Sequence, residues 1–277
     1  MRAILWGTRG SVARAGPATV RYGGDTASVE VRSDDGSWLI LDGGSGMLRI
    51  TPRVEEEVTR IDILITHLHM DHIQGLGFFH PLRNPEIDTH IWGPVSTTRD
   101  LAERLGRYLS PPLFPVRLRE MKSLHLHDIG RGEYEVGPFR VAADLVIHPG
   151  PTVGYRVEAD GATLTYIPDH EPALGVRAFP GDPRWTSGVD LMRDVDCLIH
   201  DAQYTEEEYR GRVGWGHSTL RQLLQVAGLA EVKEVVTFHH DPEHSDEMLD
   251  AMLDEAVADV QPASRVTPGV VETLIEL

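Results

Sequence analysis

Four side chains that can bind a metal ion fall within the six residues His67 to His72. The segment reads HLHMDH and supplies His67, His69, Asp71 and His72. Neutral imidazole and carboxylate are the ligands that Zn²⁺ and similar borderline ions take. Burying three histidines and an aspartate this close together is costly unless a partner satisfies them. We therefore interpret the segment as a metal-binding loop rather than as a chance surface cluster.

Three further candidate ligands follow β-rich runs at wide spacing along the chain. They are His148 in IHPG, Asp169 in YIPDH and His239 in TFHHD. A single histidine after a strand is usually a structural residue whose hydrogen bonds are satisfied within the protein. Each match alone is therefore a weak indication of a ligand, and the three support one another. The sequence leaves open three alternates, His170, His240 and His244. The segment HLHD at His125–Asp128 copies the H-x-H opening but lacks a following D-H pair, and we interpret it as a non-metal segment.

We expect short β-strands to position these side chains. β-rich runs recur along the chain and are separated by Gly, Pro and Asp turn signals, as strands should be. They are Ala3–Leu5, Ala27–Val31, Trp38–Leu41, Ile61–Ile65, Phe139–Ala142, Val153–Val157, Thr163–Ile167, Val195–Ile199 and Val235–Phe238. Helical periodicity is found over Thr98–Leu109, after Ser218 as an N-cap, and after Ser245. Many strands with interspersed helices predict an α/β class. With no linker or repeat in view, we expect one domain over residues 1–277.

The composition excludes several classes of protein. The chain has 277 residues, 41% of them hydrophobic and 25% charged, as in an ordinary globular protein. No stretch approaches the roughly 18 apolar residues of a membrane helix, and the N-terminus lacks the features of a signal peptide. The single cysteine, Cys197, lies in the apolar run VDCLI and is expected to be a small core residue. We predict a cytoplasmic protein that does not bind membranes.

The charge is strongly negative, with one local exception. A formal net charge of −17 argues against a long nucleic acid as the main partner, because Lys and Arg supply most of the affinity for phosphate backbones. The irregular stretch from Pro81 to Leu124 carries seven basic residues against five acidic ones, a local balance of +2. Residues 81–124 have two interpretations: a lid that draws in an anionic substrate, or a solvated helix with surface ion pairs.

The segment THLHMDH resembles the signature of the metallo-β-lactamase superfamily, and four further matches follow it or precede it in the expected order. They are LDGGSG (Leu41–Gly46), IHPG, YIPDH and TFHHD, and the resemblance runs from Gly7 to about His244. It implies an αββα sandwich with two metal ions at the edge of the sheets. It implies a first site of His67, His69 and His148, and a second of Asp71, His72 and His239, with Asp169 between them. His240 is the less favoured choice for the last ligand, and Asp42 would support the metal loop.

Two more motifs, HDAQY (His200–Tyr204) and GHST (Gly216–Thr219), resemble elements of the phosphodiesterase branch of this superfamily. That branch includes the transfer-RNA 3′-processing endonucleases. The resemblance implies that Asp201 orients His217, that His217 works on the scissile phosphate, and that Asp71 belongs to the same catalytic site. Aspartate stands here where the endonucleases have glutamate, which shortens the reach of the acid. The alternative for His217 is a turn residue beside Ser218, and for His200 a structural role.

The opening GTRGSVA, with RYGGDTASVEV, is similar to bacterial phosphodiesterases related to the class II cyclic-nucleotide enzymes. We therefore predict a dinuclear phosphodiesterase acting on a small anionic phosphodiester, with a cyclic nucleotide as first choice. Its cofactors would be two divalent ions, Zn²⁺ first, with Mn or Fe as alternatives, and a homodimer is implied by analogy. An RNA 3′-processing endonuclease is the nearest rival. A zinc β-lactamase, a thioesterase and a non-catalytic binding module fit the motifs less well.

Overall fold

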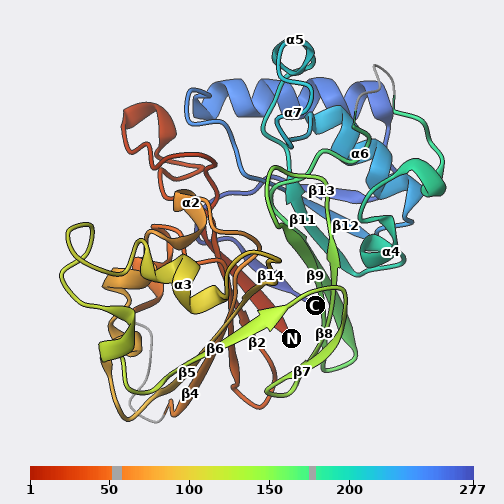
Figure 1. Ribbon diagram of the computed structural model, residues 1–277. Helices are drawn as coiled ribbons and strands as arrows, with labels where there is room; N and C mark the ends of the chain where they lie inside the picture. The colour runs from red at the N-terminus through yellow and green to blue at the C-terminus, as the bar shows by residue number, and fades with distance from the viewer. Residues whose placement is uncertain (52–57, 175–178) are drawn as a thin grey trace.

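The computed structural model describes residues 1–51, 58–174 and 179–277. Two seven-stranded sheets lie face to face, with helices on both outer faces (Figure 1). The first sheet has the order β14-β1-β2-β3-β4-β5-β6, and the second the order β13-β12-β11-β10-β9-β8-β7. This arrangement is the αββα sandwich that the resemblance implied, and the predicted fold class is confirmed.

The strands of both sheets are short. The first sheet consists of β1 (Arg2–Gly7), β2 (Ser28–Arg32), β3 (Trp38–Leu41), β4 (Arg60–Leu64), β5 (Asp88–Pro94), β6 (Leu124–Ile129) and β14 (Leu274–Glu276). The second consists of β7 (Gly132–Val136), β8 (Phe139–Leu145), β9 (Val153–Ala159), β10 (Ala162–Ile167), β11 (Cys197–Asp201), β12 (Glu234–Phe238) and β13 (Arg265–Thr267).

The helices are mostly single turns, and two are longer. They are α1 (Met47–Ile50), α2 (Met70–Ile73), α3 (Leu101–Gly106), α4 (Val189–Met192), α5 (Glu206–Arg210), α6 (Leu220–Leu229) and α7 (Asp246–Val260). Short 3₁₀ turns cover Pro17–Thr19, Leu76–Phe78, His80–Arg83, Leu118–Glu120 and Pro183–Trp185. No helix in the described ranges combines the length and the apolar composition that crossing a bilayer requires.

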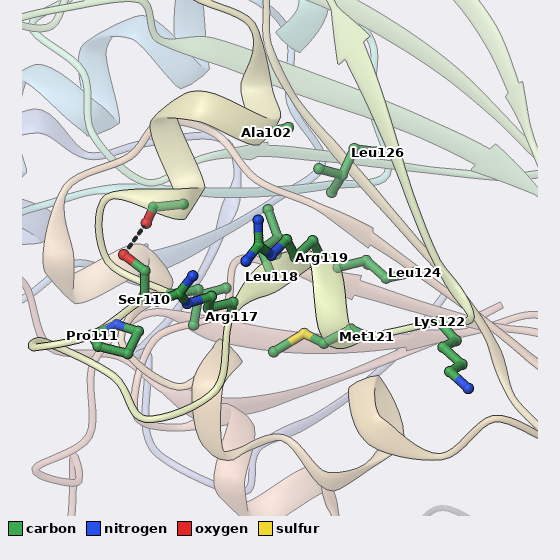
Figure 2. Close-up of a pocket in the computed structure, with 12 residues that line it drawn as sticks. Ala102, Ser110, Pro111, Arg117, Leu118, Arg119, Met121, Lys122, Leu124 and Leu126 are labelled. Carbon is green, nitrogen blue, oxygen red and sulfur yellow. Dashed lines mark hydrogen bonds between the residues drawn. The ribbon is translucent and has the colours of Figure 1, made fainter.

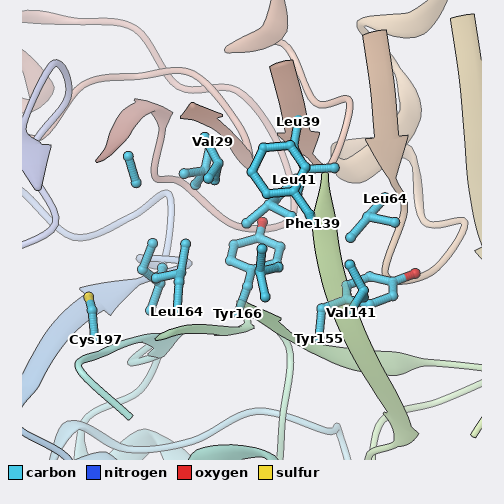
Figure 3. Packing of buried hydrophobic residues seen from close by; sticks show 14 of the residues in the cluster. Val29, Leu39, Leu41, Leu64, Phe139, Val141, Tyr155, Leu164, Tyr166 and Cys197 are labelled. Atoms are coloured by element: carbon cyan, nitrogen blue, oxygen red, sulfur yellow. The ribbon is translucent and has the colours of Figure 1, made fainter. Parts of the chain in front are cut away.

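The central core lies between the two sheets (Figure 3). Val29, Leu39 and Leu41 from the first sheet face Phe139 and Tyr166 from the second, and all are buried. Alternate residues of a strand point to opposite faces, so each strand also contributes to an outer layer. One outer core packs beneath α1 and α3, and the other beneath α4, α6 and α7.

Strand direction determines where the polar residues meet. β3, β4, β5 and β6 pair in parallel, and so do β10, β11, β12 and β13. Ligand sites of parallel sheets lie beyond the carboxyl ends of their strands. His67 follows β4, Asp169 follows β10, Asp201 ends β11 and His239 follows β12. Both sheets therefore deliver their polar loops to the same end of the sandwich.

The predicted elements agree with the structure in most places. Each of the nine β-rich runs coincides with a strand, from β1 to β4 and from β8 to β12, while β5, β6, β7, β13 and β14 were not foreseen. All three helical segments are confirmed, although α3 is shorter than Thr98–Leu109. The N-cap predicted at Ser218 is wrong. Thr219 caps α6 through a capping box with Gln222, and Ser218 instead donates its hydroxyl to the His170 carbonyl.

Residues 81–124 contribute a strand to the first sheet, and a helix and loops that cover its outer face. β5 lies inside the first sheet between β4 and β6, and α3 packs Leu101 and Leu105 into the outer core. Asp100 caps α3 by accepting a hydrogen bond from the Glu103 amide. The part that follows α3 forms loops and the turn Leu118–Glu120. A lid function for this segment stays a prediction.

Candidate metal centre

The first group of candidate ligands comes from the loops after β4, β8 and β10. One ligand atom from each of His67, His69, His148 and Asp169 lies within 4.8 Å of the others. Nε2 of His148 is 3.2 Å from Nδ1 of His69 and 3.6 Å from Oδ2 of Asp169. Atoms that share one ion at about 2.1 Å in tetrahedral geometry lie roughly 3.4 Å apart. The spacing matches that of ligands around a single ion.

The second group joins α2 to the loop after β12. Asp71, His72 and His239 bring one ligand atom each within 4.8 Å of one another. Oδ2 of Asp71 lies 3.2 Å from Nε2 of His239 and 3.4 Å from Nε2 of His72. The two imidazole nitrogens are 3.3 Å apart. These separations also match the edges of a coordination shell.

Asp169 lies between the groups and turns one carboxylate oxygen to each. Its Oδ2 is 3.7 Å from Nε2 of His67 and 3.6 Å from Nε2 of His148. Its Oδ1 is 3.0 Å from Nε2 of His72 and 3.3 Å from Nε2 of His239. The surrounding imidazoles hold the pKa of Asp169 well below its usual range, although burial opposes the charge. The geometry suits a carboxylate that bridges two ions.

Hydrogen bonds at Nδ1 leave Nε2 of three histidines turned toward the other candidate ligands. Nδ1 of His72 donates to Asp42 at 2.7 Å, Nδ1 of His239 to the Gln203 side-chain carbonyl at 3.0 Å, and Nδ1 of His148 to the Gly216 carbonyl at 2.8 Å. A histidine that donates from one ring nitrogen presents the other as an acceptor or a ligand. The predicted support from Asp42 to the metal loop is thus present in the contacts.

Asp42 is itself held tightly at the end of β3. It accepts hydrogen bonds from the amide and hydroxyl of Thr66 and from the Tyr166 hydroxyl, which reaches across the core from the second sheet. Asp42 and His239 both have positive φ, 59° and 56°. Non-glycine residues adopt this conformation at a cost that surrounding structure must offset, and such residues cluster at functional sites. Both here orient a polar side chain just beyond a strand.

Two atoms of the centre are buried without a hydrogen-bond partner among the described residues. They are Nε2 of His67 and Oδ1 of Asp169. Burial of a polar atom without a partner costs about 1–3 kcal/mol. Both atoms point into the groups described above, and burial holds the pKa of His67 well below its ordinary value. A neutral imidazole and an unsatisfied carboxylate oxygen fit divalent metal ions.

His217 and Asp201 form a hydrogen-bonded pair beside both groups. Nδ1 of His217 is 2.7 Å from Oδ2 of Asp201, so the shorter aspartate reaches its partner. The His217 ring stacks on His239 with an interplanar angle of 14°. Burial opposes a charge on His217, but the carboxylates of Asp201, Asp169 and Asp71 together raise the pKa of the imidazole above its ordinary value. With Nδ1 engaged, Nε2 is the nitrogen left to act on a substrate.

The alternates take other positions. Nδ1 of His170 lies 2.8 Å from Nε2 of His200, and His200 contacts the Asp201 carbonyl through its own Nδ1. His240 contacts the Gly269 carbonyl, and His244 contacts Glu208. None of the four belongs to a metal-competent group within the described part of the chain. His125 and His127 lie on β6 and stack against His90 and Trp92, outside those groups as well.

Glu171 is a site residue that no sequence motif indicated. Its side chain is fully buried and accepts hydrogen bonds from the Tyr209 hydroxyl and from the amides of Gly214 and Gly216, at 2.7–3.0 Å. Its own amide donates to the Ile147 carbonyl. Glu171 therefore joins the loop that precedes His217, through its carboxylate, to the loop that carries His148, through its amide.

Gly216 occupies a position that only glycine fits. Its φ is +84°, and a Cβ there would lie 2.5 Å from Nδ1 of His148 and 2.4 Å from Cδ of Pro149. Left-handed backbone is readily adopted by glycine. The close approach lets the Gly216 carbonyl accept the His148 hydrogen bond while the next residue presents His217.

Comparison with known proteins agrees with this geometry. Residues 37–240 match the family model described as the β-lactamase superfamily domain. The chain is 27% identical to ribonuclease Z of Haloarcula marismortui, over 92% of this chain and 91% of that one. It is 28% identical to ribonuclease BN of Cronobacter sakazakii, over 83% and 87%. The fold is similar to that of the metallo-β-lactamase fold protein YhfI from Bacillus subtilis, with a TM-score of 0.71, 16% identity, and 100% and 98% of the two chains covered.

Proposed function

The chain belongs to the β-lactamase superfamily as a metal-dependent hydrolase, and from this premise we propose that it cleaves phosphodiester bonds at a dinuclear centre. The observation that carries the proposal is the Asp201–His217 pair, which lies next to two metal-competent groups, with the Asp169 carboxylate turned toward both. A reaction that expels an alkoxide needs both charge stabilisation and a proton donor. The centre has residues for both, and one domain would hold them all.

We assign the ligands as the resemblance implied. His67, His69 and His148 would hold one ion, Asp71, His72 and His239 the other, and Asp169 would bind both. Imidazole and carboxylate suit Zn²⁺ first, with Mn or Fe as alternatives. Two such ions would supply activation of water and neutralisation of charge on the phosphoryl oxygens.

The remaining residues act on protons and on orientation. His217 would hold a proton on Nε2 and donate it to the departing oxygen, since Asp201 engages Nδ1 and favours the charged ring. Asp201 is kept in place by the amides of His170, Gln203 and Ser218. Asp71 accepts a hydrogen bond from the Ser11 amide at 2.7 Å, which orients its carboxylate toward His239.

For the substrate, the comparisons favour the RNA-processing alternative over the cyclic nucleotide. Both curated relatives reported above are named as ribonucleases and align with most of the chain. We therefore propose the 3′ side of a structured RNA as the first substrate class. The cyclic nucleotide remains a prediction from the sequence.

A small phosphodiester is the second candidate, and two observations favour it. The net charge of −17 weakens the attraction for a polyanion. The chain between His148 and Asp169 forms only a turn and the hairpin β9–β10, so it has no projecting arm at that position to grip an RNA.

An RNA and a cyclic nucleotide both carry a base, and one exposed side chain next to the site residues suits a base. Trp215 precedes Gly216 and is 59% exposed. Flat aromatic groups stack on nucleobases with little sequence preference. This supports a nucleotide substrate in either size class.

One comparison tests the proposal and chooses between the candidates. Purified chain with defined Zn²⁺ or Mn²⁺ is assayed on a precursor transfer RNA with a 3′ trailer, on a cyclic nucleotide and on bis(p-nitrophenyl) phosphate, with Asp169→Ala as the control. Trimming of the RNA at a single position, faster than hydrolysis of the cyclic nucleotide, supports the first candidate. The reverse order supports the second. Activity on none of them with both metal-competent groups loaded would refute the phosphodiesterase.

A further inference from the structure

A pocket of about 670 Å³ lies beneath α3 on the outer side of the first sheet (Figure 2). Its walls come from one continuous stretch, from Ala102 on α3 to Leu126 on β6. Leu124 and Leu126 stand in the N-terminal half of β6, which runs parallel to β5 and β4. Because the metal-competent residues follow the carboxyl ends of parallel strands, the pocket lies toward the other end of the sheet.

Three positively charged side chains line this pocket, and no carboxylate does. They are Arg117, Arg119 and Lys122. In Figure 2, Arg117 and Arg119 lie within the group of lining residues, and Lys122 lies at its margin beside β6. No ion pair joins any of the three to an acid within the described part of the chain, whereas nearby Arg99 and Arg104 both have one. All three are exposed, and positive charges around one pocket without a paired acid attract an anion.

The rest of the lining is largely apolar. Beside Gly106, Ser110 and Pro111, it comprises Ala102, Leu109, Leu118, Met121, Leu124 and Leu126. Leu109 and Met121 are buried members of the outer core, and Leu118, Leu124 and Leu126 are partly buried against it. Pockets that bind small molecules typically combine an apolar lining with a few polar groups that set orientation. The volume also lies within the range of such sites, about 300–1,000 Å³.

Hydrogen bonds within the chain hold the walls in place. The Leu118 amide donates to the Leu109 carbonyl at 3.1 Å, and the Ser110 hydroxyl donates to the Gly106 carbonyl at 2.6 Å. The Tyr108 hydroxyl donates to the Gln74 carbonyl at 2.7 Å, which ties the loop to the residue after α2. A preformed site loses less entropy when it binds.

We propose that this pocket binds a small amphipathic anion, in which a phosphate or carboxylate group is joined to an apolar body. The anionic group lies against Arg117 and Arg119, and the body lies over Leu118, Leu124 and Leu126. The site is separate from the metal centre and goes beyond the hydrolysis proposed above. A nucleic acid fits it less well, because the lining between the cations is apolar and concave.

Calorimetric titration with octyl phosphate tests this inference, with inorganic phosphate and octanol as the two halves of the ligand. One octyl phosphate is expected to bind per chain at the pocket, and each half alone at least about tenfold more weakly. Arg117→Gln and Arg119→Gln should each weaken binding roughly tenfold, as expected for loss of a charge-assisted contact. Ala102→Trp, at an exposed position of α3, should abolish binding by filling the pocket.

Arg107→Gln is the matched control, because Arg107 is exposed on the same segment but does not line the pocket. It should leave affinity within about twofold, since screened charges at the surface contribute little. Binding that survives Ala102→Trp but is lost in Asp169→Ala would place the ligand at the metal centre and overturn the proposal. The proposal would also be overturned if a short single-stranded RNA bound more tightly than octyl phosphate and if the same pocket variants abolished its binding. Equal affinity for inorganic and octyl phosphate would show that the pocket does not bind the apolar part of the ligand, and would overturn that part of the proposal.

Discussion

Nδ1 of His217 lies 2.7 Å from Oδ2 of Asp201, and both side chains are buried at the carboxyl ends of the second sheet. The carboxylate accepts three backbone amides in addition to the imidazole. These four hydrogen bonds occupy the acceptor positions of the carboxylate. The carboxylate is therefore fixed, and it holds the His217 ring in one orientation. A histidine held in this way is suited to repeated proton transfer at Nε2.

If His217 donates a proton, the effect of its loss depends on the leaving group. A ribose alkoxide leaves poorly without a proton, so His217→Ala should lower kcat roughly 10²–10⁴-fold on a nucleotide substrate. Nitrophenolate leaves readily as an anion, and the same variant should lose much less on an aryl phosphodiester. Asp201→Asn should follow the same order with smaller losses. Steady-state rates on the two substrate types measure this.

The metal content of these variants must equal that of the wild type. Equal losses on both substrate types would mean that His217 binds or stabilises charge instead of donating a proton. Wild-type rates for His217→Ala on the nucleotide would exclude it from the reaction.

The protein should hold about two divalent ions per chain after purification. Asp169→Ala removes both oxygens that face the two groups, so at least one ion should be lost. Elemental analysis of both proteins after dialysis gives the counts. Asn84→Ala, a change at a partly exposed position outside both groups, serves as the control. A wild type that takes up no metal on reconstitution would contradict the assignment.

Glu171→Gln should impair His217 without touching a proposed ligand. The new amide would turn an N–H toward the Gly214 or Gly216 amides, which already donate. The loop that precedes His217 should shift, and kcat should fall roughly 10–100-fold, as for other residues that orient a site. The unpaired donor should also cost about 1–3 kcal/mol of stability.

A purely structural role for Glu171 would lower activity equally on all substrates. The positioning role instead predicts a larger loss on the nucleotide than on the aryl phosphodiester, in the order seen for His217→Ala. Glu206→Gln, which changes an exposed acid on α5, is the control and should keep both rates.

Cys197 should be inert in the native protein. Its side chain is fully buried in the central core (Figure 3), and burial raises the pKa of the thiol. Because the thiolate is the reactive form, a disulfide reagent such as DTNB should modify less than about a tenth of the thiol at pH 8, until denaturant is added. Fast modification without loss of fold would show that the core is open at this position.

The sequence predicted the parts of the centre that lie within motifs. His67, His69, Asp71 and His72 share six residues, and the structure brings all four together with His148, Asp169 and His239. The reason is local: each follows a β-rich run that the turn signals delimit, and parallel strands deliver their ends to one edge. The strand and helix runs predicted only an α/β class, and the two-sheet architecture followed from the resemblance.

Other residues could not be found this way, because their roles depend on contacts made only in the folded chain. Glu171 acts on amides 43 and 45 residues away, and Gln203 on a histidine 36 residues away. Both lie in or directly after a motif, HDAQY and YIPDH, but the motif does not indicate which distant group each one contacts. β5 and β6 were missed because His90, Trp92 and His127 interrupt the aliphatic alternation, although these rings stack across the two strands. The substrate could not be predicted from the metal ligands either, since both candidate functions use the same ligand set.

Gly216 has a consequence for how the centre responds to metal removal. Its carbonyl accepts from His148, and its peptide bond continues into His217. An ion on His148 therefore acts, through one peptide unit, on the placement of the proposed proton donor. The apoprotein should exchange the amide hydrogens of residues 214–217 faster than the loaded protein does. The metal ligand His148 and the proposed acid His217 are thus linked through the Gly216 peptide. A variant that restores the position of one residue without the other would have to break this link.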